Sequence, residues 1–225
     1  PEDAVPRYYI DELNRYRVHT GHVRPVGGEA RTSLAVVETR PADAQTVLYR
    51  NGAADFALTE ADVLAVDFQP VGALVVTGTA LAKEPSRGAT QLAIRRAREA
   101  GSVVVLDIDY RAYSWASPDE AARVCRQAAD VADVVIGNDD EFGLLAGLHD
   151  RGQSLARDLA LGGALFTVYK RGAEGSDAFT PDQTIESGIF PVKALKPMGA
   201  GDGFMGGLLA GLARGHDLGT AVKRG

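Results

Sequence analysis

The order of apolar and polar residues predicts an α/β chain. From residue 59 onward, short runs of apolar, β-branched residues alternate with longer helical patterns. The strands are expected near 73–76, 103–107, 133–136, 164–169, 176–180 and 186–190. The helices are expected near 8–18, 86–99, 118–129, from Asn138 onward and from about residue 200 onward. Strands that are apolar throughout and alternate with helices are typical of a parallel sheet that helices cover on both faces.

The region between the first helix and this alternating part has a different pattern. Residues 33–38 and 45–50 are short β-branched runs, and a polar, proline-containing turn at 40–44 separates them. This pattern predicts an antiparallel hairpin. Because no repeat or flexible linker interrupts the sequence, we expect one domain over 1–225, with the hairpin part of a small flap at 30–52.

Composition and charge narrow the class of protein. Hydrophobic residues make up 45% and charged residues 24%, which excludes a disordered or coiled-coil chain. The 30 acidic residues outnumber 24 Lys and Arg, so we expect no nucleic-acid or membrane partner. Cys125 is the single cysteine, which excludes an intrachain disulfide and fits a reducing compartment. With no secretion signal or long apolar run, a cytoplasmic protein is expected.

The segment Gly199-Ala200-Gly201-Asp202, directly before an apolar helix, is the first candidate for chemistry. Glycine backbone can wrap an anion while the first free N–H groups of the helix point at it, so a phosphate would fit. Asp202 in the first helical turn is suitably placed to accept a proton from an attacking hydroxyl. A glycine turn with a capping aspartate explains the local pattern equally well.

The segment after the strand near 133–136 is the second candidate. Asn138 and Glu141 stand at the start of a helix, where their oxygens can reach a magnesium ion through water. Asn at the N-cap with Glu three residues later is also nearly a capping box, which needs no ligand. Taken alone, the pattern favours the cap.

Two further segments follow strands. Lys170 precedes a turn in which Gly172 and Gly175 would let a nucleotide approach the backbone, although a plain tight turn is the commoner cause. Asp107 and Asp109 lie on one side of an extended chain with Arg111 nearby, a pattern that a surface ion pair also explains.

The order of these motifs along the chain resembles the ribokinase-like (PfkB) family of ATP-dependent sugar kinases, over essentially all of the sequence. The resemblance implies a three-layer α/β/α sandwich with a mostly parallel sheet and a small β lid. It implies that Gly199, Ala200 and Gly201 form an anion hole and that Asp202 is the catalytic base. It also implies ATP and Mg²⁺ as ligands, with a monovalent cation as a further candidate.

The resemblance also implies roles for individual residues of this sequence. The resemblance implies that Asn138 and Glu141 organise Mg²⁺ through water, and that Lys170, Gly172 and Gly175 lie beside ATP. Lys170 stands where the family usually has Thr. For the substrate, Arg31 and Arg50 are candidates for binding a carboxylate, and Arg111 would add positive charge. Asp109 is the fourth candidate for substrate binding.

Within the family, five segments most resemble the subgroup that phosphorylates O6 of 5-dehydro-2-deoxy-D-gluconate in myo-inositol breakdown. These segments are 31–35, 48–51, 77–81, 107–113 and 188–190. In the fourth of them, Asp109 replaces the usual Asn. The family's lids often pair between subunits, which implies a homodimer.

The sequence also departs from the family and leaves other functions open. The family's N-terminal strand, its Gly-Gly-x-x-x-Asn sugar segment and a final helical tail are not found, so we expect the chain to be incomplete at both ends. The alternatives are another PfkB kinase (for 2-keto-3-deoxygluconate, fructose or ribose), a nucleotide-binding remnant without catalysis, and an NAD-dependent oxidoreductase. The last is disfavoured because a dinucleotide fingerprint belongs in the first βαβ unit.

Overall fold

The computed structural model describes residues 4–38, 46–192 and 198–225, and it confirms the α/β architecture. Its main sheet has the strand order β3-β4-β5-β6-β7-β8. The strands are β3 (Ala73–Thr77), β4 (Val103–Asp107), β5 (Val134–Asn138), β6 (Phe166–Lys170), β7 (Ser176–Phe179) and β8 (Thr184–Ser187). Strands β4, β5 and β6 run parallel, and β7 and β8 continue the sheet in antiparallel pairs.

The chain divides into two compact units. Unit one comprises residues 1–104 and 110–124, and unit two comprises residues 105–109 and 125–225. We describe each unit by itself. The expectation of a single domain over 1–225 stays a prediction.

Unit one contains the predicted hairpin. Strands β1 (Leu34–Val37) and β2 (Thr46–Tyr49) pair antiparallel, with Leu34 opposite Tyr49, which confirms the two strands. The turn expected at 40–44 lies outside the described residues. The α-helices that begin in the described part of unit one are α1 (Ala4–Arg15), α2 (Glu60–Leu64), α3 (Ser86–Glu99) and α4 (Pro118–Ala129).

The first helix differs from its predicted bounds. It begins at Ala4 and ends at Arg15, whereas the apolar spacing continues to residue 18. Arg17 has φ of 59°, a left-handed conformation that interrupts a right-handed helix. The helix therefore stops before its apolar pattern does.

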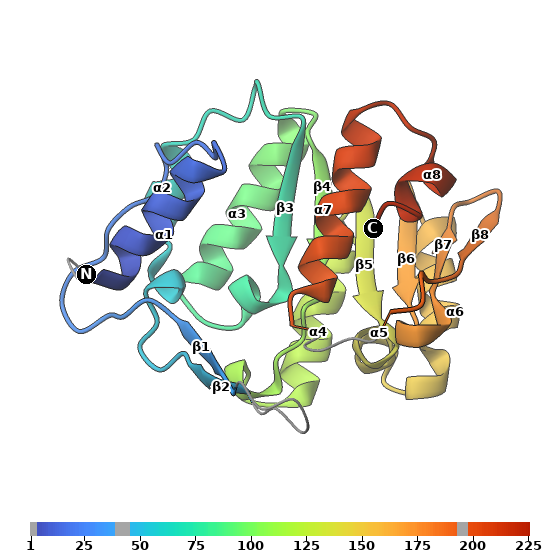
Figure 1. Ribbon diagram of the computed structural model, residues 1–225, viewed down its shortest axis with the longest axis horizontal. Coiled ribbons are helices and arrows are strands. Elements are labelled where there is room, and N and C mark those ends of the chain that lie inside the picture. The colour runs from blue at the N-terminus through green and yellow to red at the C-terminus, as the bar shows by residue number, and fades with distance from the viewer. Residues whose placement is uncertain (1–3, 39–45, 193–197) are drawn as a thin grey trace. The chain divides into compact units, whose positions relative to one another are not determined.

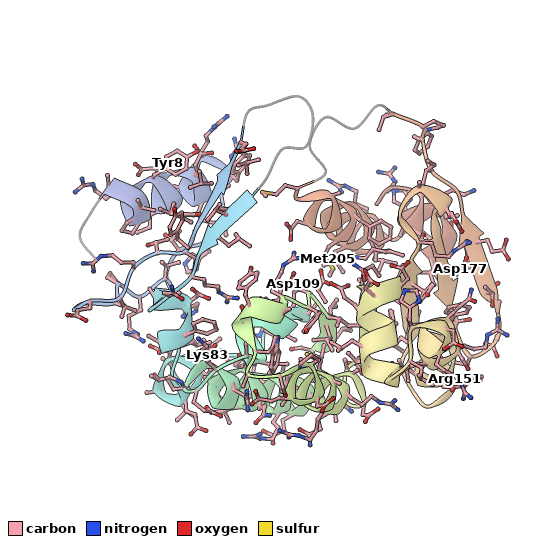
Figure 2. All side chains as sticks on the ribbon, turned by 90° about the horizontal axis from the view of Figure 1, so that it is seen from below. Tyr8, Lys83, Asp109, Arg151, Asp177 and Met205 are labelled. Atoms are coloured by element: carbon pink, nitrogen blue, oxygen red, sulfur yellow. The ribbon has the colours of Figure 1, made fainter. Side chains whose placement is uncertain are left out.

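Unit two places helices on both faces of its strands. Helices α5 (Asp139–Ala146) and α6 (Gly152–Leu161) belong to one layer, and α7 (Ala200–Ala213) and α8 (Leu218–Val222) belong to the other. Figure 1 shows α7 and α8 in front of β5 and β6 with α6 behind them, and Figure 2 shows α7 on the side opposite α6. This confirms the three-layer prediction for unit two. Helix α6 was not predicted.

The core of unit two is made by the apolar strand residues. Those with almost no exposed surface in β4, β5 and β6 are Val105, Leu106, Val135, Ile136 and Val168. Continuous burial of successive strand residues requires cover on both faces, which the two helical layers provide. Among the described residues, no helix is long and apolar enough to cross a membrane.

The last strand lies earlier than predicted. Strand β8 ends at Ser187, whereas the apolar run Ile189–Phe190 was expected to belong to it. The turn after β7 fixes the pairing, because the amide of Thr180 bonds to the carbonyl of Gln183 at 2.9 Å. Phe190 is left 81% exposed beyond the strand. Apolar character alone therefore misplaced this element.

Candidate active site

The candidate residues of unit two begin at the carboxyl ends of three neighbouring strands. Asp107 ends β4, Asn138 ends β5 and Lys170 ends β6. The register places Asp107 opposite Ile136 and Asn138 opposite Lys170, so the three ends share one edge of the sheet. The arrowheads of β5 and β6 in Figure 1 point to this edge, and Figure 2 looks onto it.

Asp107 is a buried carboxylate at this edge. It is 9% exposed, and its Oδ1 accepts a hydrogen bond from the amide of Asp109 at 3.3 Å. Burial raises the pKa of Asp107, Lys170 lowers it, and the charges of Glu141 and Asp109 raise it, so that the net value is about 6. Asp107 therefore changes its charge close to neutral pH.

Asp109 has an unusual backbone conformation. Its φ is 33°, whereas the amide of the preceding Ile108 still bonds to the carbonyl of Ile136 at 2.9 Å. Asp and Asn are the residues other than Gly that adopt positive φ most readily. This explains why Asp109 can occupy the position at which the related motif has Asn, since either residue allows the chain to leave the sheet in this way.

The start of α5 is a complete capping box, as the sequence favoured. Asn138 Oδ1 accepts from the amide of Glu141 at 2.8 Å, and Glu141 Oε2 accepts from the amide of Asn138 at 2.7 Å. Glu141 is 6% exposed. The capping role is thus confirmed, and the magnesium role stays a prediction.

The chemistry of this edge fits Mg²⁺ held largely by phosphates and water. Among the described residues, no group of three His, Cys, Asp or Glu side chains could hold a metal ion. Mg²⁺ in nucleotide sites keeps several waters and takes only one or two protein carboxylates. Glu141 and Asp107 are carboxylates of this kind, and the charge of Glu141 raises the pKa of Asp107.

The turn after β6 contains two glycines with different requirements. The amide of Arg171 bonds to the carbonyl of Gly175 at 2.7 Å and closes the turn. Gly175 has φ of 92°, and a Cβ there would collide with the carbonyl oxygen of Ser187. Gly172 has φ of 55°, and a Cβ there would meet nothing within 4 Å. Close packing therefore explains Gly175, whereas Gly172 leaves open space on its exposed side.

A buried ion pair anchors this turn. Asp177 on β7 accepts from Arg171 Nη2 at 2.8 Å and from Gln153 Nε2 at 2.7 Å, and it is almost fully buried. Figure 2 shows Asp177 well away from Asp109. Because successive strand residues point to opposite sides, Arg171 is tied to this pair while Lys170 is directed elsewhere.

Helix α7 begins as the glycine-rich segment predicts. Gly199 is the N-cap, with φ of 79° and no side-chain cap, and its carbonyl accepts from the amide of Gly203 at 2.8 Å. Asp202 lies exposed in the first turn. The preceding residues 196 and 197 lie outside the described residues. The first N–H groups of a helix have no partner within the helix, so this terminus suits an anion.

The ammonium of Lys170 lies beside this terminus. Its Nζ is 3.5 Å from the point where a Cβ on Gly201 would be, and 6.0 Å from the ring centre of Phe204. The structure therefore brings the end of β6 together with the first turn of α7. Unit two gathers Asp107, Lys170 and the α7 terminus in one place.

Glycines further along α7 have a different cause. A Cβ on Gly207 would collide with the carbonyl of Arg224, and one on Gly211 would lie 3.0 Å from Cα of Ala221. Close packing of α7 against the α8 region explains both.

The predicted substrate arginines lie in unit one. Arg31 donates through Nη1 to the carbonyls of Gly28 and Ala30, at 3.2 and 2.9 Å. Arg111 is the N-cap of a short 3₁₀ helix, Ala112–Ser114. Whether these arginines bind a substrate stays a prediction.

Arg50 is held by partners that the sequence reasoning missed. Its guanidinium pairs with Asp55, bonds to the hydroxyl of Ser114 at 3.2 Å, and lies 4.3 Å from the ring centre of Phe56. Lys83 Nζ lies 5.2 Å from the same ring centre. No sequence motif marks Asp55 or Phe56, because they belong to a short 3₁₀ helix, Ala54–Ala57.

Comparison with known proteins identifies the class of enzyme. The pfkB family of carbohydrate kinases matches residues 1–225. The chain therefore belongs to this family, and it is a sugar kinase with the ribokinase-like fold.

Particular relatives are more informative about the subgroup. The chain is 38% identical over 229 residues to 5-dehydro-2-deoxygluconokinase of Photobacterium profundum, with 100% of this chain and 69% of that protein covered. It is 36% identical over 230 residues to 5-dehydro-2-deoxygluconokinase 1 of Bacillus cereus, with the same coverage.

Solved structures agree on the fold. Fructokinase from Vibrio cholerae O395, with fructose, ADP and calcium ion bound, superposes with a TM-score of 0.83 at 29% identity, covering 98% of this chain and 73% of that one. A PfkB protein from Polaromonas sp. JS666 gives 0.84 at 26% identity, covering 99% and 74%.

Proposed function

We propose that this kinase transfers the γ-phosphoryl group of ATP to O6 of 5-dehydro-2-deoxy-D-gluconate. The names of the two relatives at 38% and 36% identity support this substrate. The observation that carries the transfer itself is the first turn of α7, which contains Asp202 and which the ammonium of Lys170 approaches at Gly201. This turn offers a proton acceptor and an anion site within a few residues.

In the proposed mechanism, Asp202 accepts the proton of the primary hydroxyl as its oxygen attacks the γ-phosphorus. The amides of Gly199, Ala200 and Gly201 hold the charge that develops on the phosphoryl oxygens. Phosphoryl transfer depends mainly on such positioning and electrostatic stabilisation. Mg²⁺, when bound through water to Asn138 and Glu141, would neutralise part of the charge on the phosphates.

The remaining site residues take the nucleotide and the sugar acid. Gly172 would let the nucleotide approach the turn after β6, and Gly175 keeps that turn closed. Arg50 and Arg31 would bind the sugar carboxylate, because a guanidinium can make two parallel hydrogen bonds to a carboxylate. Asp109 would contact sugar hydroxyls, and Arg111 would add positive charge.

The wider organisation is part of the proposal. The two units would form one ribokinase-like domain, with residues 30–52 as part of its lid, which closes over the sugar and excludes water. The apolar residues that the hairpin exposes support lid pairing in a homodimer, and these are Leu34, Val36, Val47, Leu48 and Tyr49. We place the enzyme in the cytoplasm, where Cys125, which is buried and is the single cysteine of the sequence, would stay reduced.

The test is an ADP-release assay with a panel of sugars. We expect kcat/KM for 5-dehydro-2-deoxygluconate to exceed that for fructose or ribose by about a hundredfold, since these sugars lack a carboxylate. 2-Keto-3-deoxygluconate is the sharpest competitor, because it keeps that group. Preference for any other sugar would overturn the substrate assignment. ATP binding without sugar-stimulated release would indicate a remnant, and NAD(H) binding in place of ATP would indicate an oxidoreductase.

A further inference from the structure

Lys170 places a positive charge where a helix already presents one. Its Nζ lies beside Gly201 in the first turn of α7, at 3.5 Å from the point where a Cβ would stand. The N-terminus of a helix carries a partial positive charge, so a cation there is repelled. The arrangement is favourable only when a negative group lies between the two.

The protein itself supplies only part of that negative charge. Asp107 interacts electrostatically with Lys170, and Asp202 lies in the same turn as Gly201. Within the part of the chain that the structure describes, however, the ammonium of Lys170 makes no ion pair within 4.0 Å and no hydrogen bond, and it lies 6.0 Å from the ring centre of Phe204. All three N–H donors of the ammonium are therefore available to a ligand.

We propose that Lys170 is a catalytic residue whose ammonium binds the γ-phosphoryl group and stabilises the charge on that group during transfer. This inference rests on the proposed function and assigns Lys170 a role beyond general nucleotide binding. In the step itself, the sugar oxygen forms a bond to phosphorus, the bond between phosphorus and the β-phosphate oxygen breaks, and the hydroxyl proton passes to Asp202. Lys170 keeps its own proton throughout.

The position of the side chain explains why the γ-phosphoryl group is the target. The backbone of Lys170 lies at the end of β6, directly before the turn of Gly172 and Gly175. Its ammonium reaches away from that turn to the helix that carries Asp202. The charge thus lies beside the helical turn that contains the proton acceptor, Asp202, which is the acceptor side of the reaction.

A competing explanation is that Lys170 only neutralises the buried carboxylate of Asp107. The two explanations differ in a double variant. If neutralisation were the whole role, removing both charges with K170M and D107N together would restore the activity that K170M alone loses. If Lys170 binds the phosphoryl group, the double variant stays at least as slow as K170M.

The experiment measures kcat, KM for ATP, and the affinities for ATP and ADP in the wild type and in K170M, K170R, K170Q and K170M/D107N. We expect K170M and K170Q to lose about a hundredfold in kcat, as expected for removal of one transition-state donor, with KM for ATP changed less than about tenfold. ATP affinity should fall more than ADP affinity, because only ATP has the γ-phosphate. K170R should regain part of kcat. K223M, an exposed lysine after α8, is the matched control and should behave as wild type.

Each outcome separates the proposals. A wild type without sugar-dependent ADP release would contradict the proposed function, and the comparison of ATP with ADP affinity would still test Lys170. A kcat for K170M and K170Q within about threefold of an active wild type would overturn the role of Lys170. Recovery in the double variant would also overturn it, in favour of neutralisation. If K170M fails to fold, K170Q and K170R carry the same test.

Discussion

The acids whose pKa values are shifted most in the two units are held in opposite ways. In unit one, Arg24 and Thr59 bond to Asp62 and lower its pKa. Burial raises the pKa of Asp55, but its bonds with Arg50 and Ser33 outweigh burial, so the net pKa is lowered. These acids are ionised and each is held by an arginine.

In unit two, Asp107 depends on a different kind of partner. Burial raises its pKa, whose net value is about 6, and the cation that opposes this shift is Lys170, which also approaches α7. Unit two does contain paired acids, among them Asp130 and Asp177, and the pair of Asp177 with Arg171 anchors the turn behind Lys170. The comparison teaches that acids paired with arginine stabilise the fold. Asp107 and Lys170, which form no such pair, lie where a charged ligand, the phosphates of ATP, is expected.

The strongest test of this contrast is Asp202→Asn. Loss of a general base lowers turnover by about 10²- to 10⁴-fold, and we expect about a thousandfold with ATP affinity kept. Steady-state kinetics and ATP titration measure the two effects. Asp182→Asn, which changes an exposed acid in the turn after β7, should leave both unchanged. Normal turnover in Asp202→Asn would remove this residue from the mechanism.

The two glycines of the nucleotide turn should differ in stability. Gly175→Ala adds a Cβ against the carbonyl of Ser187 in a left-handed conformation, and we expect a loss of about 3 kcal/mol in the free energy of unfolding. Gly172→Ala has open space and only the conformational cost of about 1 kcal/mol. Urea denaturation distinguishes them. Equal losses would contradict the packing explanation.

Asp107→Asn should make the protein more stable than the wild type at neutral pH. The folded pKa of Asp107, about 6, exceeds its unfolded value, so its contribution to stability is complete below about pH 4 and is lost as pH rises through 6. We therefore expect Asp107→Asn to gain about 2 kcal/mol over wild type at pH 7.5 and almost nothing at pH 4. Unfolding curves at the two pH values measure this. A gain independent of pH would point to a cause other than charge burial.

The smallest effect is expected at Arg50. Arg50→Gln should raise KM for the sugar acid about tenfold, which is the effect of losing about 1.4 kcal/mol of carboxylate binding. It should also raise the pKa of Asp55, because the bonds from Arg50 lower it. Arg24→Gln, which removes another arginine that pairs with an acid in unit one, is the control and should leave KM unchanged.

A second variant separates binding from structure at Arg50. Asp55→Asn removes the acid that occupies the guanidinium, so a substrate-binding Arg50 should keep its KM in that variant. The same rise in KM in Asp55→Asn and Arg50→Gln would show that Arg50 acts only by holding the segment that contains Asp55, and not by binding the substrate.

Local sequence patterns were sufficient to predict most of the fold and the two helix starts that contribute to the candidate site. The glycine N-cap of α7, the capping box of Asn138 and the apolar strands are all encoded within a few residues of each other, and the structure confirms them. The approach of Lys170 to Gly201 joins residues far apart in the chain, so no local pattern contains it. Asp55 was missed because ion pairs across a loop have no fixed spacing, and β8 was misplaced because Phe190 is apolar yet exposed.

The close packing of α7 against the α8 region has a consequence for sequence variation in this protein. Gly207 and Gly211 lie so close to Arg224 and Ala221 that a side chain gained at either glycine would push α7 away from its neighbour. Ala221 is itself fully buried, so a larger residue there would press on α7 from the other side. Natural variants should therefore keep small residues on both sides of this junction.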